Sequence, residues 1–271
     1  IGRHALVNNT TANNNTAVGA CSLFDNTTGT RNTAVGFQTL PNNTTGCDNV
    51  ALGYYSMQVN TSGHHNTAVG NCALYRNETG DQNTASGFKS LQENTTGCYN
   101  TALGVCSLHS NTTGVSNTAT GSWSLGTNTT GCLNTASGYT SLFKNTTGCG
   151  GTALGYKALC CNTTGLRNTG VGLCALIVST TGSDNAAFGN RALRSNTTAG
   201  QNTAIGAYAL DLNTTGQSNV AVGTVTLGGN TTGIENTASG RYAMRCNSTA
   251  SYNTAFGACS LFANTTGTRI T

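Results

Sequence analysis

Hydrophobic and polar residues recur in this chain with a period of 17 residues, and each full repeat begins at an Asn or its equivalent, first at Asn15. Counted from that residue, position 3 is Ala in 14 of 15 repeats, position 5 is always Gly, and position 9 is always Leu or Met. Position 8 is always Ser, Ala or Thr. One large apolar side chain among small residues predicts a narrow core.

The array is continuous and predicts a single domain over residues 1–271. Residues 15–269 hold the full repeats without insertion or deletion, residues 1–14 fit the end of an earlier repeat, and residues 270–271 open another. A start at Ile1, without an initiator Met or a signal-like segment, favours a processed chain or a segment of a longer one.

The spacing of the apolar residues predicts strands. A helix needs apolar residues at i, i+3, i+4 and i+7, whereas each repeat carries glycine and β-branched residues that disfavour helix. We expect two short strands per repeat, at positions 2–5 and 6–9, followed by a turn at the NTTG sequence of positions 12–15.

Charged residues indicate how the repeats stack. If one repeat forms one rung of a β-solenoid, residues i and i+17 lie about 4.8 Å apart, so opposite charges should coincide at that spacing. They do so in Arg31 and Asp48, Arg76 and Glu93, Arg167 and Asp184, and Arg194 and Asp211, with Asp48 and His65 and also His64 and Asp81 as further candidates. No like formal charges coincide at i+17. The sequence therefore predicts an all-β fold, a β-solenoid or β-roll with one repeat per rung and about 16 rungs.

Composition argues against several functional classes. Charged residues make up only 7% of the chain, against roughly 25% in ordinary globular domains. The net charge of +4 is spread without a basic run, which disfavours a nucleic-acid or anionic-membrane surface. No apolar stretch approaches the roughly 18 residues that a membrane span needs. No nucleophile elbow, phosphate loop or recurrent Asp calcium motif occurs, so we expect no enzyme and no bound cofactor.

The NTTG turns contain a recurrent acceptor pattern for N-glycosylation, which is Asn followed two residues later by Ser or Thr. The candidates are Asn9, Asn26, Asn43, Asn60, Asn77, Asn94, Asn111, Asn128, Asn145, Asn162, Asn196, Asn213, Asn230, Asn247 and Asn264. Sugars would make a chain of such low charge soluble, and we expect several turns to carry covalent N-linked glycans. The alternative is structural, because Asn and Thr suit turns and form ladders between stacked rungs.

Twelve cysteines favour an oxidising compartment. The repeat brings three pairs close enough to be disulfide candidates: Cys132 with Cys149, Cys161 with Cys174, and Cys246 with Cys259. The alternative is free or intermolecular thiols on a variable surface.

One polar cluster could hold a metal ion. Stacking would gather Asp48, His64, His65 and Asp81 on one edge of neighbouring rungs, where carboxylate and imidazole groups could bind a metal or titrate near neutral pH. A solvated patch of ion pairs is the simpler interpretation, and we expect no metal site.

The repeat phrases resemble a known family. The sequences NTAVGFQTL from Asn32 and NTAIGAYAL from Asn202 are similar to repeats in the head domains of trimeric autotransporter adhesins and in phage-type tail-fibre proteins. The resemblance implies a left-handed parallel β-roll, three chains side by side, and binding to matrix or host surfaces outside the cell. Here the rung is longer, and cysteines and acceptor sites are added.

These features together predict a structural segment of an extracellular or cell-surface fibre, glycosylated at the NTTG turns and assembling end to end with copies of itself. The alternative is the shaft of a trimeric adhesin or tail fibre that binds host or matrix surfaces.

Overall fold

A computed structural model describes residues 1–271, which divide into two compact units, residues 1–134 and 135–271. Each unit contains only short β-strands and turns, and the sequence folds in the same way in both. No helix in the structure has the length and apolar character needed to cross a bilayer.

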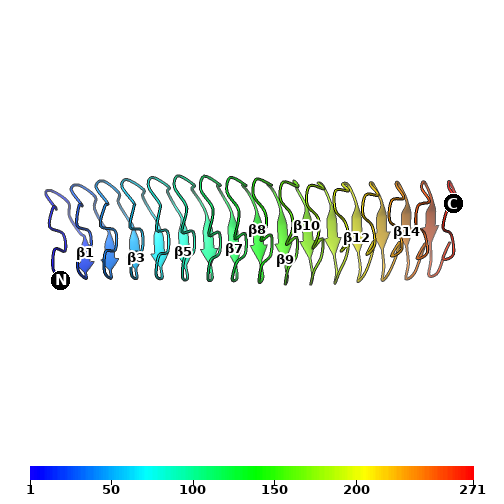
Figure 1. Cartoon of the computed structure of the whole chain (residues 1–271), viewed down its shortest axis with the longest axis horizontal. Helices are drawn as coiled ribbons and strands as arrows, with labels where there is room; N and C mark the ends of the chain where they lie inside the picture. The colour runs from blue at the N-terminus through cyan, green and yellow to red at the C-terminus, as the bar shows by residue number, and fades with distance from the viewer. The chain divides into compact units, whose positions relative to one another are not determined.

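Every strand occupies positions 2–4 of a repeat, as Figure 1 shows for successive rungs. In unit 1 the strands are β1 (Thr16–Val18), β2 (Thr33–Val35), β3 (Val50–Leu52), β4 (Thr67–Val69), β5 (Thr84–Ser86), β6 (Thr101–Leu103) and β7 (Thr118–Thr120). In unit 2 they are β8 (Thr135–Ser137), β9 (Thr152–Leu154), β10 (Thr169–Val171), β11 (Ala186–Phe188), β12 (Thr203–Ile205), β13 (Val220–Val222), β14 (Thr237–Ser239) and β15 (Thr254–Phe256).

Neighbouring strands within a unit pair in parallel, with each residue opposite its equivalent one repeat later. Thr33 lies opposite Val50 in unit 1, and Ala204 lies opposite Ala221 in unit 2. The predicted β-solenoid with one 17-residue repeat per rung is therefore confirmed in each unit.

The core is as narrow as the repeat predicts. The Ala of position 3 points inward from the strand, and the Leu or Met of position 9 packs behind it, as Ala85 and Leu91 do with no exposed surface. Position 8 is also buried in most rungs, as at Ser90. One large side chain per rung contacts its equivalents above and below, so each rung depends on its neighbours for a core.

The second predicted strand, at positions 6–9, is wrong. Positions 7 and 9 adopt left-handed backbone conformations, with φ of 56° at Lys89 and 50° at Leu91, and therefore cannot continue an extended strand. Both residues still join the stack: the Lys89 N–H donates to the Asn71 carbonyl oxygen of the preceding rung at 3.0 Å, and the Leu91 N–H donates to the Ser107 carbonyl oxygen of the following rung at 3.0 Å. Position 17 is left-handed too. Such residues persist only where the surroundings hold them, and here the two neighbouring rungs do so.

Two structural constraints explain why position 5 is always Gly. Gly70 has a φ of +132°, a conformation that side chains disfavour, and a Cβ atom there would lie 2.5 Å from the Gly87 carbonyl oxygen. The strand thus turns where adjacent backbones approach most closely, which only glycine permits.

The core assignment predicts that Leu91→Ala lowers local stability by about 2–5 kcal/mol, because it leaves a cavity between two rungs. Leu103→Ala, on the exposed side of β6, should change stability by no more than about 0.5 kcal/mol. Amide hydrogen exchange of the Leu74 and Leu91 N–H groups measures the difference. Equal effects of the two substitutions would contradict the assignment.

Candidate functional site

The Asn side chains of the NTTG turns form a buried ladder. Asn94 is fully buried, and its Nδ2 donates to the Asn77 Oδ1 of the preceding rung at 2.8 Å and to the Gly97 carbonyl oxygen of its own turn at 2.9 Å. The same two bonds recur at Asn60 and Asn111. Both hydrogens of each amide are used inside the fold.

The Asn residues of position 1 form a second ladder that reaches the same carbonyl oxygens. Asn83 Nδ2 donates to the Gly97 carbonyl oxygen at 2.8 Å, and the Asn100 N–H donates to Asn83 Oδ1 at 3.0 Å. Gly97 has room for no side chain, since a Cβ atom would lie 2.5 Å from both Asn94 Oδ1 and the Gly114 carbonyl oxygen. The repeated Asn and Gly residues are therefore explained by packing and hydrogen bonding.

The predicted glycosylation stays a prediction, but the folded structure argues against it. An N-linked sugar is attached at Nδ2, where it would replace a hydrogen that the ladder uses. Interior acceptors such as Asn43 and Asn213 are fully buried, so no space remains for a sugar. Only Asn9 and Asn264 are half-buried, and each also donates from Nδ2 to a backbone carbonyl.

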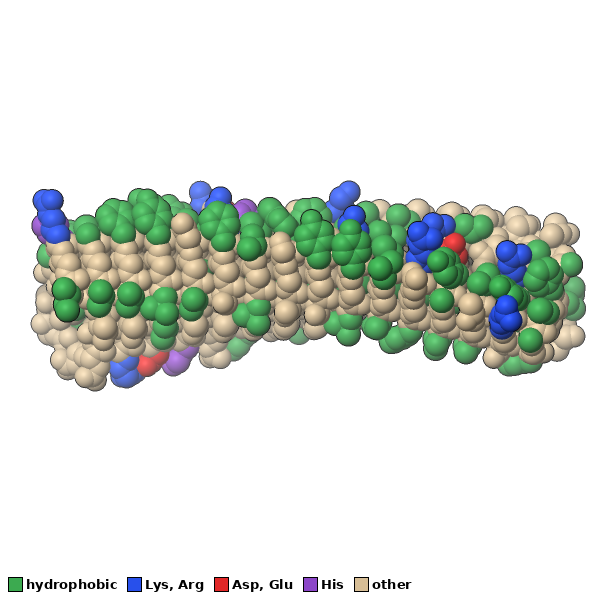
Figure 2. All heavy atoms as spheres, turned by 90° about the horizontal axis from the view of Figure 1, so that it is seen from below, with side chains coloured by type: hydrophobic (Ala, Val, Ile, Leu, Met, Phe, Trp, Pro, Cys, Tyr) green, Lys and Arg blue, Asp and Glu red, His purple; other side chains and the backbone are tan.

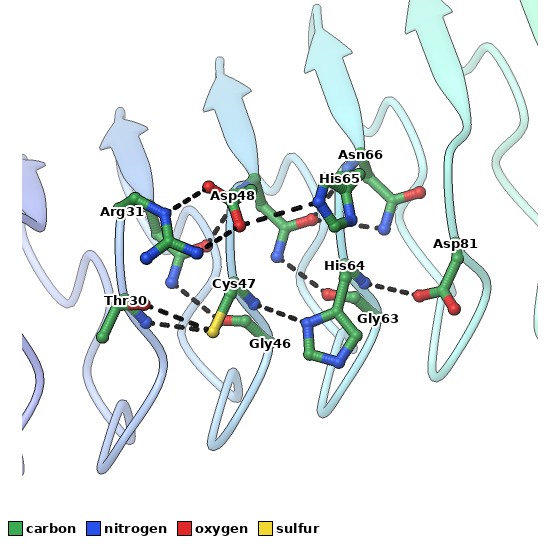
Figure 3. Close-up of polar contacts among 12 residues, drawn as sticks. Thr30, Arg31, Gly46, Cys47, Asp48, Gly63, His64, His65, Asn66 and Asp81 are labelled. Carbon is green, nitrogen blue, oxygen red and sulfur yellow. Dashed lines mark hydrogen bonds and ion pairs between the residues drawn. The ribbon is translucent and has the colours of Figure 1, made fainter.

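Position 17 carries a row of exposed charges that pair between rungs, as Figure 3 shows for unit 1. Arg31 Nε lies 2.6 Å from Asp48 Oδ1, and Arg31 Nη2 lies 2.8 Å from Asp48 Oδ2. His65 Nε2 continues the row, 3.7 Å from Asp48 Oδ2. The hydrogen bond from Arg31 holds the pKa of Asp48 below its usual range.

The other predicted Arg–carboxylate pairs also form. Arg167 Nε lies 2.6 Å from Asp184 Oδ1 in the same exposed position, and Arg76 Nη1 lies 3.0 Å from Glu93 Oε2. Arg194 Nε lies 2.9 Å from Asp211 Oδ1, where the Asp211 side chain is only 16% exposed. Burial raises the pKa of Asp211 despite the nearby arginine.

Position 16 has a role that the sequence did not indicate. Where this position carries Cys, His, Asp or Ser, the side chain in several rungs accepts a hydrogen bond from the backbone N–H of position 16 in the preceding rung. In this way Cys47 Sγ accepts from Thr30 N at 3.3 Å, His64 Nδ1 accepts from Cys47 N at 2.9 Å, and Asp81 Oδ1 accepts from His64 N at 2.6 Å. Serines accept likewise in unit 2, as from Leu166 N to Ser183 Oγ at 3.0 Å.

The candidate metal cluster is divided between these two rows (Figure 3). Asp48 and His65 belong to the position 17 row, whereas His64 and Asp81 belong to the position 16 row and accept bonds from the backbone. The expected pair of His64 and Asp81 therefore forms through the His64 backbone and not through its imidazole ring. No group of three or more ligating side chains gathers in a way that could hold a metal ion.

The disulfide candidates remain predictions. Cys161, Cys174, Cys246 and Cys259 are thiols in the structure, the first three half-buried and the last exposed. Cys132 belongs to unit 1 and Cys149 to unit 2. Elsewhere, burial raises the pKa of the Cys106 thiol, which lowers its reactivity at neutral pH.

The outward face of the strands is uncharged. Position 4 presents Val, Leu, Ile, Phe, Ser or Thr to solvent, and position 2 presents Thr, Val or Ala, with no charged residue in any repeat. Val35, Leu103 and Ile205 are exposed by 37%, 39% and 43%. Figure 2 shows hydrophobic side chains in rows on the face it draws. Such a surface is available for contact with another uncharged surface.

The Asn ladder predicts opposite outcomes for two substitutions that destroy the same acceptor pattern. Asn94→Ala leaves buried acceptors unsatisfied and should cost about 1–3 kcal/mol, whereas Thr96→Ala changes an exposed side chain and should cost no more than about 0.5 kcal/mol. Hydrogen exchange of unit 1 measures both. Equal destabilisation by the two variants, in protein from a glycosylating host, would favour the sugar over the ladder.

The half-buried ion pair predicts a pH-dependent effect of Arg194→Met. Without Arg194 the shielded Asp211 carboxylate lacks its partner, so unit 2 should lose about 1–2 kcal/mol at pH 7. Because the folded pKa of Asp211 is raised, its protonated form is favoured in the fold, and the loss should shrink as the pH falls through that pKa. Urea unfolding at several pH values tests this, with Arg167→Met at the exposed pair as the control. A loss that is independent of pH would contradict the assignment.

Comparisons with protein-family models, curated proteins and solved structures give no match to this chain.

Proposed function

We propose that this chain is a structural segment of an extracellular fibre and that its copies assemble end to end. The observation that carries the proposal is the register within each unit, where every rung repeats the backbone pairing of its neighbour without a bulge. A rung therefore presents nearly the same row of donors and acceptors to the rung on either side. Rungs of a second copy can pair by the same bonds.

The interior chemistry supports a structural role. The core holds Ala, Leu, Met, Ser, Thr and Asn together with Cys106, and no charged side chain is among the buried residues. Position 13 adds hydroxyl bonds along the stack, as from Thr95 Oγ1 to the Thr112 carbonyl oxygen at 3.1 Å. The buried amides and hydroxyls form hydrogen bonds to neighbouring rungs, which strengthens the array. Few polar side chains therefore remain in positions suited to catalysis.

The extracellular location is proposed on the cysteine content and on the resemblance of the repeats to surface adhesins. The proposed fibre does not require glycosylation, because the Nδ2 atoms of the acceptor asparagines form hydrogen bonds inside the Asn ladder. Stability along the fibre comes instead from the amides themselves.

A second candidate function is the shaft of an adhesin or tail fibre in which three chains lie side by side. The uncharged outward face at positions 2 and 4 favours it, because this face could pack against the same face of another chain. Lateral association would use side chains, whereas end-to-end assembly would use backbone edges. Substitutions can therefore separate the two candidates.

Electron microscopy and sedimentation of the purified chain test the proposal. We expect filaments that lengthen with protein concentration and whose rungs continue across chain junctions with the spacing of about 4.8 Å. The double variant Ile205→Lys and Val222→Lys places charges on the outward face only, so filament growth should persist. Discrete trimers that this variant dissociates would establish lateral association and overturn end-to-end assembly, as would particles that stay single at all concentrations.

A further inference from the structure

Unit 2 has a hollow of about 410 Å³ on the ridge formed by positions 7, 10 and 11. Gly228 and Gly229 occupy positions 10 and 11 of one rung, where the rungs on either side carry Asp211 with Leu212 and Arg245 with Cys246. The ridge is thus interrupted for one rung between larger side chains. The volume lies within the range of small-molecule sites.

Backbone forms the floor of this hollow and keeps it open. A Cβ atom at Gly229 would lie 2.6 Å from the Arg245 carbonyl oxygen, and one at Gly228 would lie 2.8 Å from Val225 Cγ1. The Gly229 N–H donates to the Arg245 carbonyl oxygen at 2.9 Å, and the Gly228 carbonyl oxygen accepts from Leu212 N at 3.2 Å. The floor is therefore held by the rung-to-rung ladder, and the site is formed before any ligand binds.

The charges around the hollow favour an anion. Asp211 is already compensated by Arg194, 2.9 Å away. Arg245 is exposed and forms no ion pair, and its guanidinium carbon lies 5.6 Å from the Tyr242 ring centroid and 5.8 Å from that of Phe262. Arg191 adds a further cation, 5.7 Å over the Tyr208 ring. Arg191 and Arg194 act on Asp211, whereas Arg245 is the one arginine in the lining of the hollow. Arg245 retains a planar set of donors that fits a carboxylate.

The remaining side chains of the lining, Tyr208, Leu212, Val225 and Cys246, offer mainly apolar surface. Tyr208 contributes the one neutral hydroxyl group of the lining, which is too few for the several hydroxyl groups of a sugar ring. We propose that this hollow binds a small aromatic carboxylate, with the carboxylate on Arg245 and the ring against Tyr208, Leu212 and Val225. The site is independent of whether the chain assembles end to end or laterally.

Titration of the folded chain with benzoate and with its uncharged counterpart benzamide tests this proposal by calorimetry or by NMR of unit 2. We expect saturable binding of benzoate. Benzamide should bind at least roughly tenfold more weakly than benzoate, because the amide lacks the negative charge that pairs with Arg245. Glucuronate, which has the carboxylate without an aromatic ring, should bind more weakly than benzoate.

Two matched variants locate the site. Arg245→Gln should weaken benzoate binding roughly tenfold. Arg241→Gln removes an equal charge, 4.6 Å from the same Tyr242 ring but outside the hollow, and should leave binding within about twofold. Circular dichroism checks that both variants keep the fold. Absence of saturable benzoate binding, equal binding of benzamide or glucuronate, or an equal loss in both variants would each overturn the proposal.

Discussion

The rest of the structure depends on two buried asparagines that meet at one backbone carbonyl in most rungs; Gly151 and Ser179 are the exceptions in the full repeats. Around Gly97, Asn94 and Asn83 both donate to the carbonyl oxygen, and each also connects to the equivalent residue of a neighbouring rung. Unpaired amides buried in this way would be costly, whereas paired ones hold each rung to the next. The ladder fixes the register at 17 residues because a shift by one residue would leave the amides of every rung without partners.

Stacking between rungs also accounts for a backbone conformation that would otherwise be improbable. Outside the three-residue strands, left-handed residues such as Lys89 and Leu91 alternate with ordinary ones, and the N–H groups of these two residues donate to opposite neighbouring rungs. Leu has no intrinsic preference for that conformation. Hydrogen bonds to the rungs on either side stabilise the left-handed conformation of Leu91. Each of these Leu or Met side chains packs against its equivalents in neighbouring rungs, so one large apolar residue per rung is enough for a core.

With the interior fixed by backbone and amides, the outer side chains are free to vary, and the surface chemistry lies there. Position 17 carries the Arg31–Asp48 and Arg167–Asp184 pairs between rungs, and position 16 supplies acceptors of several kinds, including a thiol, an imidazole and a carboxylate. The ridge of positions 7, 10 and 11 carries the hollow at Gly228 and Gly229. Variation in these positions can therefore change binding properties without disturbing the stack.

The sequence by itself determined the period, the all-β class, the core residues and the stacking at i+17, because identical residues in a parallel stack must meet their own equivalents. Arg31 and Asp48 could be paired on that ground alone. Only the tertiary structure decided that positions 6–9 are not a strand, because the left-handed conformations of Lys89 and Leu91 are imposed by neighbouring rungs and not by residue preference. It also decided that Asn94 points inward, since an Asn-Thr-Thr sequence is compatible with both a sugar-bearing turn and a buried ladder. Which of the two forms depends on whether the neighbouring amide and the Gly97 carbonyl oxygen lie within hydrogen-bonding distance, and that is set by the stacked fold.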